Sequence, residues 1–139
     1  MSRVLVSDEM NKCLGCFTCQ RVCAGINHKS YSDMESAIKV RTLGGLSSGK
    51  FFATHCFACR GKRACVSVCP TGALTDRKGG GVILNEKKCI SCRKCESACI
   101  VNAIHFAGEN EPPIICKHCG ICARYCPHHC LRMEERPDD

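Results

Sequence analysis

Large apolar side chains are scarce in this sequence. Its 139 residues include no tryptophan, two tyrosines and five phenylalanines. Such a chain builds only a thin hydrophobic core, and small proteins of this kind usually rely on disulfides or bound metals. The sequence also lacks an apolar run long enough to span a membrane, and its first residues, MSRVLVSDEMNK, lack the apolar segment of a secretory signal. We therefore expect a cytoplasmic protein without a membrane span, stabilised by something other than its apolar side chains.

Cysteine, in contrast, is abundant. There are seventeen cysteines, an odd number, and disulfides are rare in a reducing cytosol, so a disulfide scaffold is not expected. Sixteen of them form four sets, named here in chain order. The first set is Cys13, Cys16, Cys19 and Cys23, the second Cys56, Cys59, Cys65 and Cys69, the third Cys89, Cys92, Cys95 and Cys99, and the fourth Cys116, Cys119, Cys122 and Cys126.

The spacing within these sets is typical of cysteines that bind 4Fe–4S clusters. Three sets have C-x2-C-x2-C-x3-C spacing, in which three cysteines ligate one cluster and the fourth ligates a neighbouring cluster. The second set has five residues, 60–64, between its second and third cysteines, where the regular spacing has two. Zinc sites instead use C-x2-C pairs with a longer spacer. We therefore predict that all sixteen cysteines are metal ligands for four [4Fe–4S] clusters, with no catalytic residue and no other cofactor.

The formal net charge of +7 counts every cysteine as a neutral thiol. An oxidised cluster with four thiolates carries a charge of about −2, so four clusters add about −8. We expect the excess of Lys and Arg to compensate this charge, because a nucleic-acid surface would need interleaved aromatic residues. Gly44 to Lys50 matches the start of a phosphate-binding loop, but Phe51 replaces the Ser or Thr that would hold magnesium, and a hairpin turn is predicted there.

Short secondary-structure elements are expected between the cysteine sets. Residues 19–23 predict a turn of helix, and residues 134–139 predict a frayed polar tail. Alternation and turn residues predict strands over residues 3–6, 36–42, 50–54, 73–75, 81–84, 103–106, 113–115 and 128–133.

The order of the sets predicts how they pair. The connector from Cys69 to Cys89 resembles that of a bacterial two-cluster ferredoxin, so the second and third sets should share one unit and the first and fourth another. The predicted fold is α+β, with tandem ferredoxin-like folds and one unit (residues 55–111) inserted into the other (residues 1–54 plus 112–139). Sequential pairing, first set with second and third with fourth, is the alternative, and it would make the 36–54 hairpin an unusually long connector.

In its four sets, and in the segment GGLSSGKFFATHCFACRGKRACVSVCPTGAL, the sequence resembles the four-cluster ferredoxin-like electron-transfer subunits of multi-subunit oxidoreductases. These include the iron–sulfur subunits of formate hydrogenlyase, carbon-monoxide-linked hydrogenase, dimethyl-sulfoxide-reductase-type enzymes, tungsten aldehyde oxidoreductases and benzoyl-coenzyme A reductases. The resemblance spans nearly the whole chain and implies the ligands of each cluster. Cluster one takes Cys13, Cys16, Cys19 and Cys126; cluster two Cys56, Cys59, Cys65 and Cys99; cluster three Cys69, Cys89, Cys92 and Cys95; cluster four Cys23, Cys116, Cys119 and Cys122.

The resemblance implies a non-catalytic subunit in anaerobic metabolism. Its expected partner is a large catalytic subunit, of the tungsten or molybdenum aldehyde oxidoreductase type, and electrons would pass to or from a flavin- or NAD-binding subunit or a ferredoxin. A hydrogenase or formate dehydrogenase complex is the alternative, and copies of the chain could also join end to end. Two other classes compete with a relay: an enzyme with its own redox chemistry, which would need a cluster lacking a cysteine ligand, and a zinc or iron–sulfur interaction module.

Three further residues neighbour the expected ligands. His55 and His118 could tune a cluster by titrating near neutral pH, but such histidines are more often solvated or hydrogen-bonded. Cys130, the seventeenth cysteine, is expected to be a small buried hydrophobe. The basic residues Arg60, Lys62 and Arg63 would either dock an acidic partner or form a solvated loop.

Overall fold

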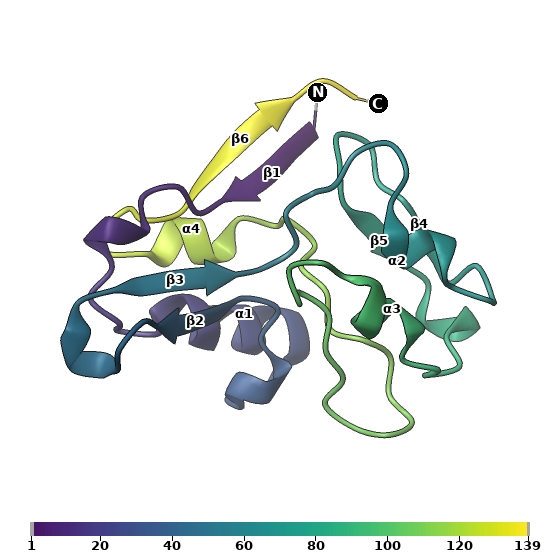
Figure 1. Cartoon of the computed structure of the whole chain (residues 1–139), viewed down its shortest axis with the longest axis horizontal. Coiled ribbons are helices and arrows are strands. Elements are labelled where there is room, and N and C mark those ends of the chain that lie inside the picture. The colour runs from purple at the N-terminus through teal and green to yellow at the C-terminus, as the bar shows by residue number, and fades with distance from the viewer. Residues whose placement is uncertain (1, 139) are drawn as a thin grey trace.

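The computed structural model describes residues 2–138, which form three two-stranded antiparallel sheets and short helices (Figure 1). This agrees with a small mixed fold of the ferredoxin-like kind. Every helix among the described residues is too short or too polar to cross a bilayer. The longest, α1 (Thr18–His28), has eleven residues and contacts α4 (Ile121–Tyr125), although the two are far apart in the sequence.

The first sheet joins the two ends of the chain. Strand β1 (Ser2–Val6) pairs with β6 (Arg132–Arg136), with Val4 opposite Glu134. The strand predicted over 128–133 is therefore displaced to 132–136, and the prediction of a frayed tail is wrong for residues 134–136. His129 has a φ of 54°, and this left-handed turn keeps residues 128–131 out of the ladder. The charged segment 132–136 becomes a strand because β1 supplies its hydrogen-bond partners.

The second sheet is the hairpin predicted from the sequence. Strand β2 (Lys39–Thr42) pairs with β3 (Phe51–Thr54). The turn between them contains the short 3-10 helix η3 (Leu46–Ser48), and a strand rather than a helix follows Lys50. A phosphate-binding loop would require a helix at that point. Two more 3-10 turns, η1 (Met10–Lys12) and η2 (Asp33–Glu35), connect this part of the chain.

The third sheet lies in the middle of the sequence. Strand β4 (Leu74–Asp76) pairs with β5 (Val82–Leu84), close to the predicted strands at 73–75 and 81–84. Helices α2 (Ala64–Ser67) and α3 (Lys94–Ala98) contact each other beside it, and η4 (Glu86–Lys88) leads into the third set. The strands predicted at 103–106 and 113–115 reduce to a single bridge between His105 and Ile114.

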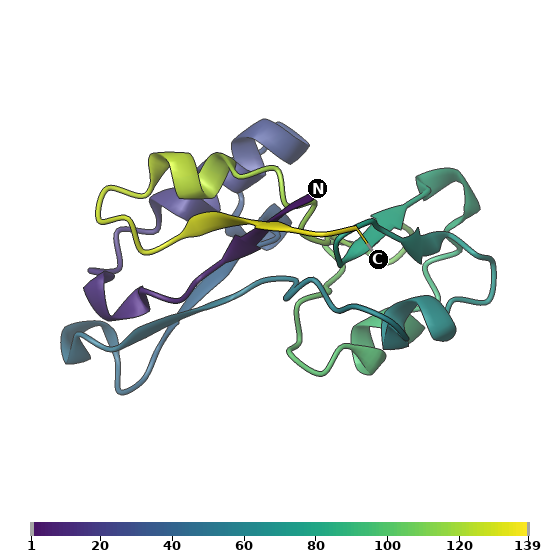
Figure 2. The same ribbon diagram turned by 90° about the horizontal axis from the view of Figure 1, so that it is seen from above.

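Two small hydrophobic cores match this arrangement. One includes Leu5, Ile38 and Leu131, and the other includes Leu74 and Phe106. Figure 2 shows α2, α3, β4 and β5, coloured teal to green, gathered on one side, with α1, α4 and the β2–β3 hairpin on the other. Cys23, Cys116 and Cys122 belong to the first core and Cys95 to the second, and Cys56 packs against both, so the apolar interior and the candidate metal centres coincide. The insertion of one unit into another remains a prediction.

Candidate metal centres

The first cysteine of each set is wrapped by the backbone that follows it. Its Sγ accepts a hydrogen bond from the N–H two residues later, at 3.4 Å in the first, third and fourth sets. In the second set, Cys56 accepts the equivalent hydrogen bond from the backbone N–H of Ala58, which is also two residues later. All four donors have left-handed backbone conformations: Gly15 (φ 73°), Ala58 (φ 56°), Ser91 (φ 57°) and His118 (φ 58°). Non-glycine residues seldom adopt this conformation, and its fourfold repetition turns each N–H towards a sulfur.

The third cysteine of each set is the second residue of a helix. This holds for Cys19 in α1, Cys65 in α2, Cys95 in α3 and Cys122 in α4. The fourth cysteine comes four residues later; it lies within α1 in the first set and just beyond the end of the helix in the other three. In the third and fourth sets this cysteine accepts the N–H four residues beyond it: Ala103 donates to Cys99 at 3.3 Å and Cys130 to Cys126 at 3.4 Å.

The cysteines converge in four groups, and three of them line cavities. One cavity is lined by Cys23, Cys116, Cys119 and Cys122, a second by Cys56, Cys59, Cys65 and Cys99, and a third by Cys69, Cys89, Cys92 and Cys95. In the fourth group, Cys19 lies close enough to three other cysteines for them to raise its thiol pKa: Cys13, Cys16 and Cys126. The groups contain the residues that the resemblance assigns to clusters four, two, three and one, and we name them sites four, two, three and one accordingly.

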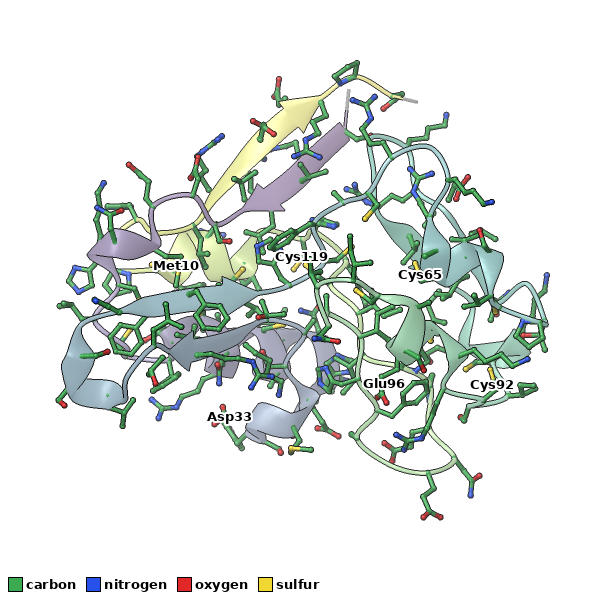
Figure 3. All side chains as sticks on the ribbon, in the orientation of Figure 1. Met10, Asp33, Cys65, Cys92, Glu96 and Cys119 are labelled. Carbon is green, nitrogen blue, oxygen red and sulfur yellow. The ribbon has the colours of Figure 1, made fainter. Side chains whose placement is uncertain are left out.

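Members of three sets lie at separate places in the fold. Figure 3 labels Cys65, Cys92 and Cys119, which come from the second, third and fourth sets. The second set has five residues where the other sets have two, yet Cys65 still lines its cavity, and Gly61 (φ 67°) provides a turn within the longer loop. The second cysteine of every set is exposed, so each site reaches the surface at one edge.

Burial controls the acidity of the thiols. Burial, with a smaller contribution from nearby cysteines, raises the pKa of Cys19 and Cys116 to about 12 and that of Cys56 and Cys95 to about 11. Without a cation, these thiols stay protonated at neutral pH. A bound metal reverses this preference, because a coordinating thiol is deprotonated.

The donor set fits [4Fe–4S] clusters. Each site offers four thiols, and backbone N–H groups are directed at their sulfurs, as expected around a sulfur-ligated cluster. No three His, Cys, Asp or Glu side chains within residues 2–138 are close enough to hold a single metal ion. A cluster spreads its four cysteines over several iron atoms, so wider ligand spacing suits it.

The histidines beside the ligands are buried and hydrogen-bonded. His118 accepts the N–H of Leu5 through Nδ1 at 3.0 Å, and burial lowers its pKa to about 3. His55 contacts Ser7 Oγ through Nε2 at 3.1 Å and the carbonyl oxygen of Cys56 through Nδ1 at 2.8 Å, and burial lowers its pKa as well. Both are thus neutral at physiological pH, which favours the structural interpretation over titration.

The other two expectations near the ligands have different outcomes. Cys130 is buried, with 2% of its surface exposed, as expected for a small hydrophobe. The basic segment of the second set is only partly solvated. Arg63 is 3% exposed and forms an ion pair with Asp76 at 3.1 Å, whereas Arg60 donates to the carbonyl oxygen of Pro137 at 2.9 Å.

The sequence did not single out Asn27. Its side-chain amide lies between two candidate ligands, 3.8 Å from Cys23 Sγ and 3.7 Å from Cys119 Sγ. Asn27 follows Cys23 by four residues, so the signal was present, but only a helix longer than the predicted 19–23 turn puts both residues on one face.

Comparison with known proteins assigns iron–sulfur domains to the middle of the chain. Residues 57–72 and 82–105 each match a family model described as a 4Fe-4S binding domain. An anaerobic dimethyl sulfoxide reductase subunit of Haemophilus influenzae is 28% identical over 148 residues, covering 88% of this chain and 69% of the relative. Formate hydrogenlyase subunit 2 of Escherichia coli is 34% identical over 109 residues, covering 78% of this chain and 50% of the relative.

A third relative is the probable anaerobic dimethyl sulfoxide reductase chain YnfG of Escherichia coli, 26% identical over 149 residues, with 90% of this chain and 70% of the relative covered. The chain thus spans half of formate hydrogenlyase subunit 2 and about 70% of the two dimethyl sulfoxide reductase relatives. The two matched domains and the grouped cysteines lead to one conclusion: this is an iron–sulfur protein whose cofactors are multiple [4Fe–4S] clusters.

Proposed function

We propose that the chain is an electron-transfer subunit that relays electrons through four [4Fe–4S] clusters, between a catalytic subunit and a second redox subunit or acceptor. The observation that carries this proposal is the gathering of sixteen cysteines into four groups of four. A cluster with four cysteine ligands leaves no iron open to a substrate. The subunit is therefore non-catalytic, and its relatives are themselves named as parts of larger enzymes.

We assign each site one cluster, with the sixteen ligands grouped as above. Each cluster would accept and release one electron, and the chain's own residues set how near the sites lie to each other. Helix α1 supplies Cys19 to site one and Cys23 to site four, about 6 Å apart along the helix axis. Helix α4 links the same two sites through Cys122 and Cys126, while the α2 and α3 segments link sites two and three.

The connection between these two pairs of sites involves Cys116 and Cys56. Cys116 of site four lies near enough to Cys56 of site two for their charges to interact, and Cys56 packs against both hydrophobic cores. We therefore infer the relay order one, four, two, three. The exposed cysteines at the two ends, Cys16 and Cys92, are where electrons would enter and leave.

The domain division is part of this proposal. An outer unit, residues 1–54 plus 112–139, would hold sites one and four, and an inserted unit, residues 55–111, would hold sites two and three. The pairing of β1 with β6 and the presence of two cores, which meet at Cys56, support this division.

For the catalytic partner, we propose a tungsten or molybdenum aldehyde oxidoreductase-type subunit in the cytoplasm, on the resemblance of the segment from Gly44 to Leu74. A hydrogenase or formate dehydrogenase complex is the second candidate, and the similarity to formate hydrogenlyase subunit 2 favours it. End-to-end association of copies through sites one and three would lengthen the relay.

Anaerobic co-purification with a tagged chain tests the partner. We expect a large subunit containing tungsten or molybdenum, and cluster reduction by an aldehyde only when that subunit is present. A nickel-containing or formate-oxidising partner would select the second candidate. Reduction of the isolated chain by a small substrate would refute the non-catalytic role. Zinc in place of iron would refute the relay and favour an interaction module.

A further inference from the structure

Asn27 lies between two sulfurs that come from distant parts of the chain. Its Nδ2 is 3.8 Å from Cys23 Sγ in α1 and 3.7 Å from Cys119 Sγ in the fourth set. A side-chain amide nitrogen carries two N–H donors, so this one group can donate to both sulfurs. Asn27 lines the same cavity as these two cysteines, together with Cys116 and Cys122.

The length of α1 explains why a side chain, and not the backbone N–H four residues later, donates to Cys23 from this helix. In the third and fourth sets, the backbone N–H four residues after the last cysteine is free to bond its sulfur. Helix α1 instead continues past Cys23 to His28, and the N–H of Asn27 is used inside the helix. Residues 19, 23 and 27 share one helix face, so the side chain of Asn27 occupies the place of the missing backbone donor.

The amide also reaches a second sulfur that is otherwise exposed. Cys119 is exposed, whereas Cys23 is buried and also accepts the N–H of Ala37 at 3.3 Å. Hydrogen bonds to ligand sulfurs and solvent exposure are two of the factors that set the potential of a cluster. Helices α2, α3 and α4 all end before the fourth cysteine of their set. Only α1 continues for a further turn, so only α1 can present a side-chain amide one turn beyond its fourth cysteine.

We propose that Asn27 is a positioning residue that raises the reduction potential of the cluster in site four. This inference rests on the proposed relay function. Reduction adds one electron and makes the ligand sulfurs more negative, so two N–H donors stabilise the reduced state more than the oxidised state. Site four, which lies between sites one and two in the proposed relay, then holds an electron more readily than it would without the amide.

The variant N27L removes both donors and keeps the branching at Cγ, and N110L, at an exposed turn position, is the matched control. In an EPR-monitored redox titration of the anaerobic holoprotein, N27L should shift one midpoint potential negative and leave the others unchanged. The expected size is about tenfold in the one-electron equilibrium, which corresponds to about 59 mV. N27D should shift the same potential further, because a carboxylate repels the added electron, and N110L should shift none.

N27Q keeps the amide on a longer stem and should recover part of the shift, which a purely structural role would not predict. If N27L binds less iron, the smaller N27A, which removes the amide without adding bulk or charge, decides: a negative shift of one potential at full iron content supports the role of Asn27. Unchanged potentials in an N27L, N27A or N27D protein with full iron content would overturn it. A wild-type protein without four reducible clusters would instead refute the relay function, so the two failures are distinguishable.

Discussion

The loop from Gly79 to Gly81 should control the second site through one close contact. Gly80 has a φ of 119°, and a Cβ built on it would lie 2.3 Å from the carbonyl oxygen of Ala58. Ala58 is the residue whose N–H bonds Cys56, so the glycine loop supports the wrapped backbone of the second set. Gly81 strengthens this contact by donating its N–H to the carbonyl oxygen of Cys59 at 3.1 Å.

The variant G80A adds one methyl group at this contact. The unfavourable backbone conformation costs about 1–3 kcal/mol, and the overlap adds about 1–3 kcal/mol. Because the obstructing atom belongs to the backbone, the Cys56–Cys59 loop must move. We therefore expect G80A to lose the cluster of site two, which is about four iron atoms per chain.

Gly49 provides the matched control. Its φ is 71° and a Cβ there would meet nothing within 4 Å, so G49A incurs only the conformational cost of about 1–2 kcal/mol. Iron analysis and the rate at which visible cluster absorbance is lost on heating compare the two variants. G49A should keep all its iron. Equal iron content and equal stability in G80A and G49A would refute the link between the glycine loop and site two.

Three further predictions follow from single groups. Because burial raises the pKa of the Cys19 thiol to about 12 from 9.0, whereas a cysteine that ligates iron must be a thiolate, protons compete with iron for this site, and the holoprotein should lose iron as the pH falls; iron retention measured over a pH series tests this, and an iron content independent of pH would contradict it. Q20L leaves the N–H of Val40 without its Oε1 acceptor and should lower unfolding stability by about 1–3 kcal/mol, measured by denaturant titration of the holoprotein. C130A should keep its full iron content while C126A loses iron; the reverse would make Cys130 a ligand.

The sequence predicted best the features that local chemistry controls. The short spacing between cysteines is a requirement of the cluster itself, so the candidate ligands could be predicted from the sequence without knowledge of the tertiary contacts. The β2–β3 and β4–β5 hairpins were also predictable, because turn residues such as Gly79 and Gly80 mark them in the sequence.

Features that depend on distant contacts were missed or misplaced. Gly25 and Asn27 are weak helix formers, so the sequence gives little reason to extend α1 beyond Cys23. The contact between α1 and α4 stabilises that extension, and it exists only once both chain ends have come together. The β6 strand was misplaced for the same reason. Its charged segment, RMEER, lacks the composition of a strand, and it becomes one because it pairs with β1.

The central claim is that four complete groups of cysteines hold four clusters around which this chain folds. Iron and zinc analysis of anaerobically reconstituted protein, combined with Mössbauer spectroscopy, tests it most directly. The account predicts about sixteen iron atoms per chain, all in [4Fe–4S] clusters, and loss of the compact fold when the iron is removed. Fewer than about twelve iron atoms, zinc in their place, or a stable folded metal-free chain would contradict it.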